Sequence, residues 1–152
     1  MSYLVDTGIL LRLTNRADPA YQDVREAIRT LKMRGEDMYT LAQNMAEFWN
    51  VSTRPTSARG GYGLSVQQTD RRLRLIERLI PVLSDTPAAY SEWRRLVVAH
   101  SVMGVQAHDA RIVGAMNTHG VSHILTLNGR DFARYQGITV VAPQEITRAP
   151  QP

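Results

Sequence analysis

Four acidic residues stand where a fold could bring them together, although they are far apart in the chain. Asp6 follows a short apolar run, Asp109 opens a helical pattern, and Asp131 comes soon after another apolar run. Glu47 lies in a helical stretch between the first two. Isolated carboxylates in such places are costly unless something pairs them. If they converge, their mutual repulsion favours a divalent cation, and a cation would allow phosphate chemistry.

Length and composition fit one globular domain. The 152 residues are 43% hydrophobic and 21% charged, which is enough for a real core. We expect a domain over residues 1–146 and a frayed tail over 147–152. The lack of cysteine excludes disulfides, thiolate nucleophiles and cysteine metal sites. We find no signal peptide and no stretch long enough to span a bilayer, so we expect a cytoplasmic protein that does not engage membranes.

The charge balance permits nucleic-acid binding without requiring it. The net charge is +4, and every one of the 18 basic residues except Lys32 is an arginine. Arginine presents a planar fork that suits phosphate. Codon bias in a GC-rich genome explains the same excess equally well.

Short apolar segments alternate with amphipathic helices along the chain. This order predicts a three-layer α/β/α sandwich around a mainly parallel sheet. Strands are predicted at Tyr3–Val5, Asp37–Thr40, Pro81–Leu83, His123–Thr126 and Ile138–Val141. Helices are predicted at Thr7–Leu13, Tyr21–Met33, Leu41–Thr53, Ser65–Ile80, Thr86–Val98 and Asp109–His119, with an irregular loop over Arg54–Gly63.

This fold would gather the four carboxylates. In a parallel sheet, residues just past the carboxyl ends of the strands line one common edge, and both Asp6 and Asp131 follow predicted strands. Asp109 shares its helix with a buried apolar stripe, so it should face the sheet. Glu47 lies at the border of an apolar helical face, together with Asn44.

Each carboxylate also has a simpler interpretation when taken alone. Asp6 and Asp109 are typical N-caps of the helices that follow them. Asp131 is a plausible cap of a short turn at Phe132–Tyr135, and Glu47 a plausible surface residue. These separate interpretations do not explain why a buried strand ends on Asp-Thr-Gly in this order of elements.

Four motifs in this order resemble those of PIN-domain ribonucleases, above all the VapC-type toxins of bacterial toxin–antitoxin pairs. The resemblance covers nearly the whole chain. The motifs are Val5-Asp6-Thr7, Ala46-Glu47-Phe48-Trp49-Asn50-Val51, His108-Asp109-Ala110 and Leu125-Thr126-Leu127-Asn128-Gly129-Arg130-Asp131-Phe132.

The resemblance implies an endoribonuclease that uses Mg²⁺ or Mn²⁺. The first three acidic positions of the family fall on Asp6, Glu47 and Asp109, and the fourth falls on Asn128 or on Asp131. We expect Asp6 and Asp109 to be direct metal ligands, with Glu47 and Asp131 completing the site through water or a second ion. Attack by water should leave 5′-phosphate and 3′-hydroxyl ends.

The same resemblance implies substrate contacts and partners. Thr7 and Thr126 match positions where a hydroxyl orients a carboxylate or touches phosphate. The expected substrate-binding residues are Thr7, Arg12, Asn44, Thr126 and Asn128, with Arg54 and Arg59 as further candidates for phosphate. The expected partners are RNA, a cognate antitoxin laid across the acidic groove, and a second copy of the chain in a homodimer.

Three other functions fit parts of the sequence. Asp6-Thr7-Gly8 is the signature of aspartic proteases, although those enzymes are all-β. His100, His108, His119 and His123 could serve a metal-free ribonuclease with a matched acid and base. An inactive PIN-like fold that binds nucleic acid or protein is the third alternative.

Overall fold

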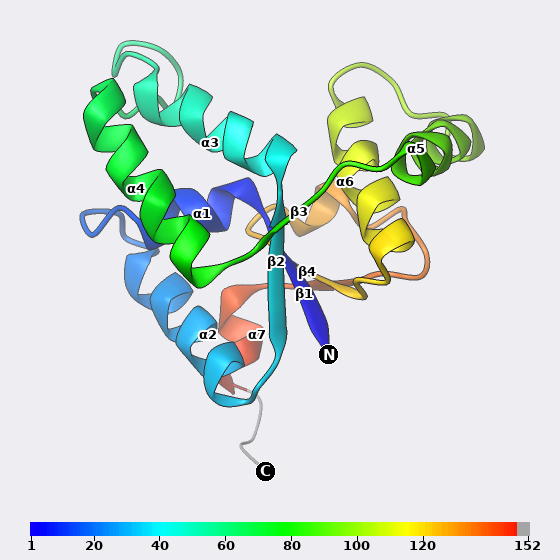
Figure 1. Cartoon of the computed structure of the whole chain (residues 1–152), viewed down its shortest axis with the longest axis horizontal. Helices are drawn as coiled ribbons and strands as arrows, with labels where there is room; N and C mark the ends of the chain where they lie inside the picture. Colours follow the sequence, from blue (N-terminus) through cyan, green and yellow to red (C-terminus); the bar gives the residue numbers. More distant parts are fainter. Residues whose placement is uncertain (149–152) are drawn as a thin grey trace.

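The computed structural model describes residues 1–148, which form a parallel sheet covered by helices on both faces (Figure 1). The sheet has the order β3-β2-β1-β4-β5, and all neighbouring strands are parallel. The strands are β1 (Ser2–Val5), β2 (Asp37–Leu41), β3 (Val82–Leu83), β4 (His123–Leu125) and β5 (Thr139–Val141). The helices are α1 (Thr7–Leu13), α2 (Tyr21–Met33), α3 (Ala42–Thr53), α4 (Val66–Leu79), α5 (Pro87–Ala99), α6 (Gln106–His119), α7 (Pro143–Arg148) and the 3₁₀ turn η1 (Gly129–Asp131).

Two hydrophobic cores lie on opposite faces of the sheet, as expected for a three-layer sandwich. Successive side chains of a strand point to opposite faces. Val5 therefore packs in the core under α1, α2, α3, α4 and α7, whereas Leu4 packs in the core under α5 and α6. Figure 1 shows these two helical layers on the left and the right of the sheet. The predicted α/β/α fold is confirmed, and the sheet is wholly parallel.

The predicted elements are all present, with two corrections. Helix α6 begins at Gln106, three residues before the predicted start, because Gln106-Ala107-His108 continues the same helical turn. The predicted tail is wrong over residues 147–148, which end the short helix α7. That helix has two buried residues, Pro143 and Ile146, which are too few to give a periodic signal in the sequence. The rest of the predicted tail, residues 149–152, lies outside the described residues.

None of the helices within residues 1–148 is both long enough and apolar enough to cross a membrane.

Candidate active site

Asp6 is held at the carboxyl end of β1 by hydrogen bonds to both of its carboxylate oxygens. Its backbone N–H donates to Leu125 O on the adjacent strand β4, over 3.1 Å. Its Oδ1 accepts from the Thr7 backbone N–H at 2.8 Å, so Asp6 is also the N-cap of α1. Its Oδ2 accepts from the Thr126 hydroxyl at 2.7 Å. The N-cap interpretation and the site interpretation of Asp6 are therefore compatible.

A buried amide connects Asp6 with Glu47. Asn44 on α3 is fully buried, and its Nδ2 donates to Asp6 Oδ1 at 3.4 Å and to the Thr7 hydroxyl at 3.1 Å. Its Oδ1 accepts from the Leu41 backbone N–H at the start of the helix. The Thr7 hydroxyl in turn donates to Glu47 Oε2 at 2.6 Å. This chain of donors fixes the direction of the Thr7 hydroxyl proton and positions the Glu47 carboxylate.

Gln43 holds the other oxygen of Glu47, and sequence reasoning missed it. Its Nε2 donates to Glu47 Oε1 at 3.0 Å and to the backbone carbonyl oxygen of His108 at 2.9 Å. Gln43 thus joins α3 to the first turn of α6, next to Asp109. Gln43 stands four residues before Glu47, on the same helical face, and this spacing could have predicted the contact between them.

The carboxylates are close enough to perturb one another. Burial raises the pKa of Asp6, the hydrogen bonds from Thr126 and Thr7 oppose this rise, and the charges of Glu47 and Asp131 add to it. Burial, together with the charges of Asp131, Asp6 and Glu47, raises the pKa of Asp109 to about 6. The fold therefore brings the four predicted carboxylates into one electrostatic cluster.

Asp131 lies close enough to the cluster for its charge to act there, and the choice between Asn128 and Asp131 for the fourth position of the family stays a prediction. Asp131 ends the 3₁₀ turn η1, and its charge acts on both Asp6 and Asp109. Asn128 is exposed and offers its backbone N–H to the Thr126 hydroxyl. Asp131 belongs to the turn before Phe132 and does not cap a helix there. Likewise, Asp109 lies in the first turn of α6 and is not its N-cap, which is Val105.

Three of the predicted substrate contacts are buried. Asn44 and Thr126 are 0% and 1% exposed, and Thr7 is 8% exposed. Their contact with RNA stays a prediction, and their hydrogen bonds support a role in orienting carboxylates. This agrees with the orienting role that the resemblance allowed for the two threonines.

The remaining predicted contacts lie at the surface. Asn128 is exposed and Arg12 is partly exposed. The Arg12 guanidinium donates to Gly8 O at 3.3 Å and lies 3.7 Å from Asp18. Arg54 donates to Arg59 O within the 54–63 loop. Their contact with RNA stays a prediction.

The rival enzyme classes lose support from this geometry. The parallel α/β fold is incompatible with the all-β aspartic proteases. Three of the four histidines have structural partners: His100 packs on Tyr135, His119 Nε2 lies 2.9 Å from Ser84 O, and His123 Nδ1 lies 2.7 Å from Ser122 Oγ. A matched pair of histidines around one phosphate is not formed within the described part of the chain.

The carboxylate cluster suits a divalent cation. Burial and the neighbouring negative charges disfavour the ionised forms of Asp6 and Asp109, and an oxygen-seeking cation would relieve this. Within residues 1–148, no group of three or more histidine, aspartate or glutamate side chains is placed so that it could hold a metal ion as a set. Magnesium needs only one or two protein carboxylates, because waters and substrate phosphate supply its other ligands. Asp6 and Asp109 are the residues that would hold it.

The model of the PIN domain family matches residues 3–138 of this chain. The chain therefore belongs to the PIN domain family, as its motifs predicted. No curated protein sequence is significantly similar to it.

Solved structures with the same fold include toxin–antitoxin proteins. VapBC2 from Rickettsia felis bound to promoter DNA is 14% identical with a TM-score of 0.65, covering 93% of this chain and 98% of its own. DNA-bound VapBC from Salmonella typhimurium is 19% identical with a TM-score of 0.64, covering 94% and 98%. VapC20 from Mycobacterium tuberculosis, a toxin that cleaves the sarcin–ricin loop, is 17% identical with a TM-score of 0.64, covering 86% and 93%.

Proposed function

We propose that the protein is a Mg²⁺- or Mn²⁺-dependent endoribonuclease and the toxin of a toxin–antitoxin module. The observation that carries this proposal is the convergence of Asp6, Glu47, Asp109 and Asp131. Three of these groups come from separate elements: Asp6 from the carboxyl end of β1, Glu47 from α3, and Asp109 from the first turn of α6. Folding places them together against their own repulsion, which is costly unless the cluster serves a cation.

The residues of the cluster and those that hold them would have different roles in catalysis. Asp6 and Asp109 hold the cation, and the buried donors Thr126 and Asn44 keep the Asp6 carboxylate in one orientation. Glu47, fixed by Thr7 and Gln43, accepts a proton from water at the edge of the cluster. A bound divalent ion makes a coordinated water more acidic and offsets charge on the phosphate oxygens.

The toxin assignment is supported by the family and by relatives that are solved together with antitoxins. A toxin–antitoxin complex from Klebsiella pneumoniae has the same fold, with 18% identity and a TM-score of 0.64. An antitoxin that masks the acidic cluster is the partner we propose for this chain.

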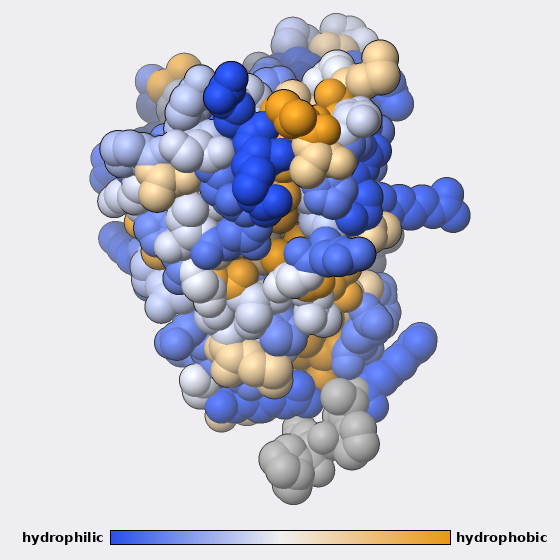
Figure 2. Space-filling model, turned by 90° about the vertical axis from the view of Figure 1, so that its right-hand side faces the viewer, coloured by the Kyte–Doolittle hydropathy of each residue, from blue (hydrophilic) through white to orange (hydrophobic). Residues whose placement is uncertain are grey.

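A homodimer is also proposed, and its support lies on the face of α5 and α6. Val98, Met103 and Val105 are 76%, 79% and 82% exposed. Figure 2 shows this face, with apolar side chains gathered near the top among hydrophilic ones. Large exposed apolar side chains grouped on one face are typical of protein interaction surfaces.

The decisive experiment compares cleavage of structured RNAs in Mg²⁺, Mn²⁺ and EDTA. We expect cleavage with either ion, none in EDTA, and products with 5′-phosphate and 3′-hydroxyl ends. Asp6→Asn and Asp109→Asn should each lower the rate by at least about 100-fold while the variants still unfold cooperatively. Asp37→Asn is the matched control, because Asp37 is an exposed aspartate at the start of β2, at the opposite edge of the sheet.

Two results would contradict the proposal. Cleavage that persists in EDTA and leaves cyclic phosphates would point to histidine chemistry instead. A wild-type protein that cleaves no RNA with any divalent ion, yet binds RNA or protein, would establish the inactive interaction module.

A further inference from the structure

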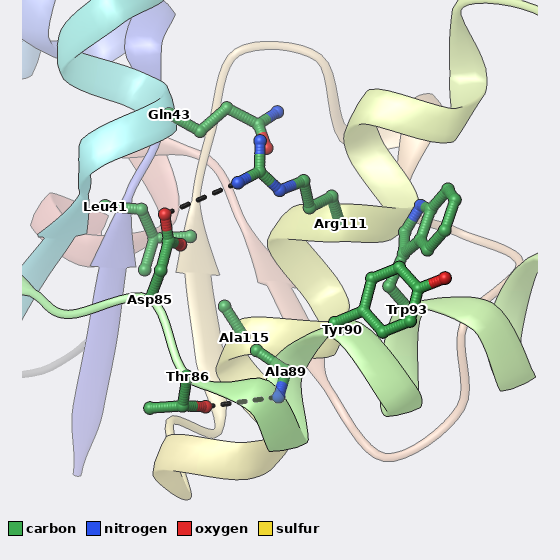
Figure 3. A pocket seen from close by; sticks show the side chains of 9 residues that line it. All are labelled: Leu41, Gln43, Asp85, Thr86, Ala89, Tyr90, Trp93, Arg111 and Ala115. Atoms are coloured by element: carbon green, nitrogen blue, oxygen red, sulfur yellow. Dashed lines mark hydrogen bonds and ion pairs between the residues drawn. The ribbon is translucent and has the colours of Figure 1, made fainter.

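A pocket of about 360 Å³ is joined to the carboxylate cluster by Gln43, which lines the pocket and also donates to Glu47. Figure 3 shows it between the end of β2, the segment before α5, α5 itself and α6. Leu41 and Ala115 contribute apolar surface to its lining. Its volume is within the range of about 300–1,000 Å³ that is usual for small-molecule sites.

Two aromatic rings line the α5 side of this pocket. Tyr90 and Trp93 have ring centroids 5.7 Å apart and planes tilted by 36°. The Trp93 indole N–H donates to Ala107 O at 2.9 Å, which fixes that ring, whereas Tyr90 is 63% exposed. An exposed aromatic ring beside a fixed one offers a stacking surface for a planar ligand.

Gln43 gives the pocket an acceptor that lacks a donor. Its Nε2 bonds to Glu47 Oε1 and His108 O, which are both acceptors, so the amide has only one sensible orientation. Its Oε1 is then buried without a hydrogen-bond partner among the described residues. The oxygen is shielded from solvent, so the N–H donor of a ligand reaches it only when a neighbouring side chain of the pocket, the exposed Arg111, turns aside.

Arg111 supplies a cation at the same place. Its guanidinium lies 3.4 Å from Asp85, and the two side chains are 53% and 59% exposed. Figure 3 shows this pair near Gln43, away from the Tyr90 ring. An exposed ion pair is weak, so Arg111 can exchange Asp85 for a phosphate at little cost.

We propose that this pocket binds one nucleobase of the RNA substrate and so selects the cleavage site. Tyr90 and Trp93 stack on the base, Gln43 Oε1 accepts from its exocyclic amino group, and Arg111 pairs with its phosphate. Gln43 lies between the pocket and the cluster, because it lines the pocket and also holds Glu47. A base bound in the pocket would therefore place the adjacent phosphodiester at the carboxylate cluster. Uracil has a carbonyl where cytosine has its 4-amino group and so presents an acceptor to Gln43 Oε1, and adenine and cytosine are therefore preferred to uracil. This inference rests on the proposed ribonuclease function.

Nucleoside monophosphates test the pocket without catalysis. In EDTA, AMP and CMP should shift the indole N–H signal of Trp93 in a nitrogen–proton NMR spectrum and leave that of Trp49 in place. UMP should bind several-fold more weakly. Tyr90→Ala should weaken AMP binding by about ten-fold or more, since base stacking is lost. Tyr21→Ala, a partly exposed tyrosine on the opposite helical layer, is the matched control and should bind as the wild type does.

The outcomes separate this inference from the proposed function. RNA cleavage with no movement of the Trp93 signal at millimolar nucleotide overturns the pocket alone. Nucleotide binding without RNA cleavage supports the pocket and refutes the nuclease. Equal binding of UMP and AMP overturns the role given to Gln43. If nucleotides do not bind and Tyr90→Ala instead weakens antitoxin binding, the pocket is a protein docking site and the inference is wrong.

Discussion

The Thr126 hydroxyl donates to Asp6 Oδ2 at 2.7 Å, although 120 residues separate the two in the chain. The contact exists because β4 pairs with β1 in parallel, so that Val5 lies opposite Leu125 and the next residue of each strand reaches the same edge. One strand thereby carries the carboxylate and its neighbour carries the donor that orients it.

Removing this donor should impair the site without dismantling the fold. Thr126→Val keeps the side-chain shape and loses the hydrogen bond, and we expect activity to fall by about 10- to 100-fold, as is usual when the partner of a metal-binding carboxylate is lost. Rates at saturating Mg²⁺ and the Mg²⁺ concentration for half-maximal rate are the measurements. Thr126→Ser retains the donor and should stay within a few-fold of the wild type, and equal activity of Thr126→Val would show that the contact is only structural.

Asp109→Asn should stabilise the metal-free protein while abolishing cleavage. The folded-state pKa of Asp109 is raised to about 6 from an ordinary value near 3.8. The contribution of Asp109 to the stability of the folded protein is therefore present below pH 4 and is lost as the pH rises through 6. At pH 7 in EDTA the variant should therefore have a higher Tm than the wild type, because one repelling charge is gone.

Added Mg²⁺ should reverse that order by raising the Tm of the wild type and leaving the variant unchanged. A variant that is less stable than the wild type in EDTA would contradict this account of the charge cluster.

Glu92 should stabilise the folded protein at neutral pH and lose this effect in acid, which is the opposite of the pH dependence expected for Asp109. Its hydrogen bond from Arg95, with a second from Asn117, lowers its pKa to about 2 from an ordinary 4.5. The stabilisation is therefore present above pH 4.5 and is lost as pH falls toward 2. Glu92→Gln should lower urea stability slightly at pH 6, since the side chain is partly exposed, and the difference from the wild type should shrink by pH 3. A difference that grows on acidification would refute the assignment.

Gly114 should not tolerate alanine, although alanine normally favours a helix. A Cβ at this position would stand 3.0 Å from Trp93 N and 3.2 Å from Ala89 O, both backbone atoms of α5. Helix α5 would have to move away from α6, and we expect Gly114→Ala to cost about 1–3 kcal/mol in the free energy of unfolding. Chemical denaturation measures it, and Ala110→Gly in the same helix is a comparison that creates no clash.

Met103→Asp tests the proposed dimer surface. Met103 is 79% exposed in the loop after α5, so a charge there should leave the unfolding transition of the monomer unchanged. A buried, unpaired charge in an interface is costly, and we expect the dimer to weaken by at least about ten-fold. Light scattering after gel filtration across a range of concentrations reports it, and Met33→Asp, at a methionine of α2 that is 60% exposed, should leave the mass unaltered.

The amino-acid sequence alone determined the elements and the residues that bear charge. Apolar runs and helical spacing fixed Tyr21–Met33 to the residue and most other elements to within a few residues, since these patterns record which side faces a core. The position of Asp6 after a buried strand and of Asp109 at a helix start likewise follow from local pattern. Helix α7 was not predicted because its two buried residues, Pro143 and Ile146, are too few to form a periodic pattern.

The tertiary structure decided how these groups meet. Local pattern cannot show that Asn44 turns inward to Asp6 or that Gln43 bridges Glu47 and His108, because both depend on how α3 packs against β1 and α6. Nor could it show that the charge of Asp131 acts on Asp6 and Asp109, which depends on the course of the turn after β4. The sequence specifies which side chain stands at each position, but hydrogen-bond partners and electrostatic neighbours arise only when distant elements pack together.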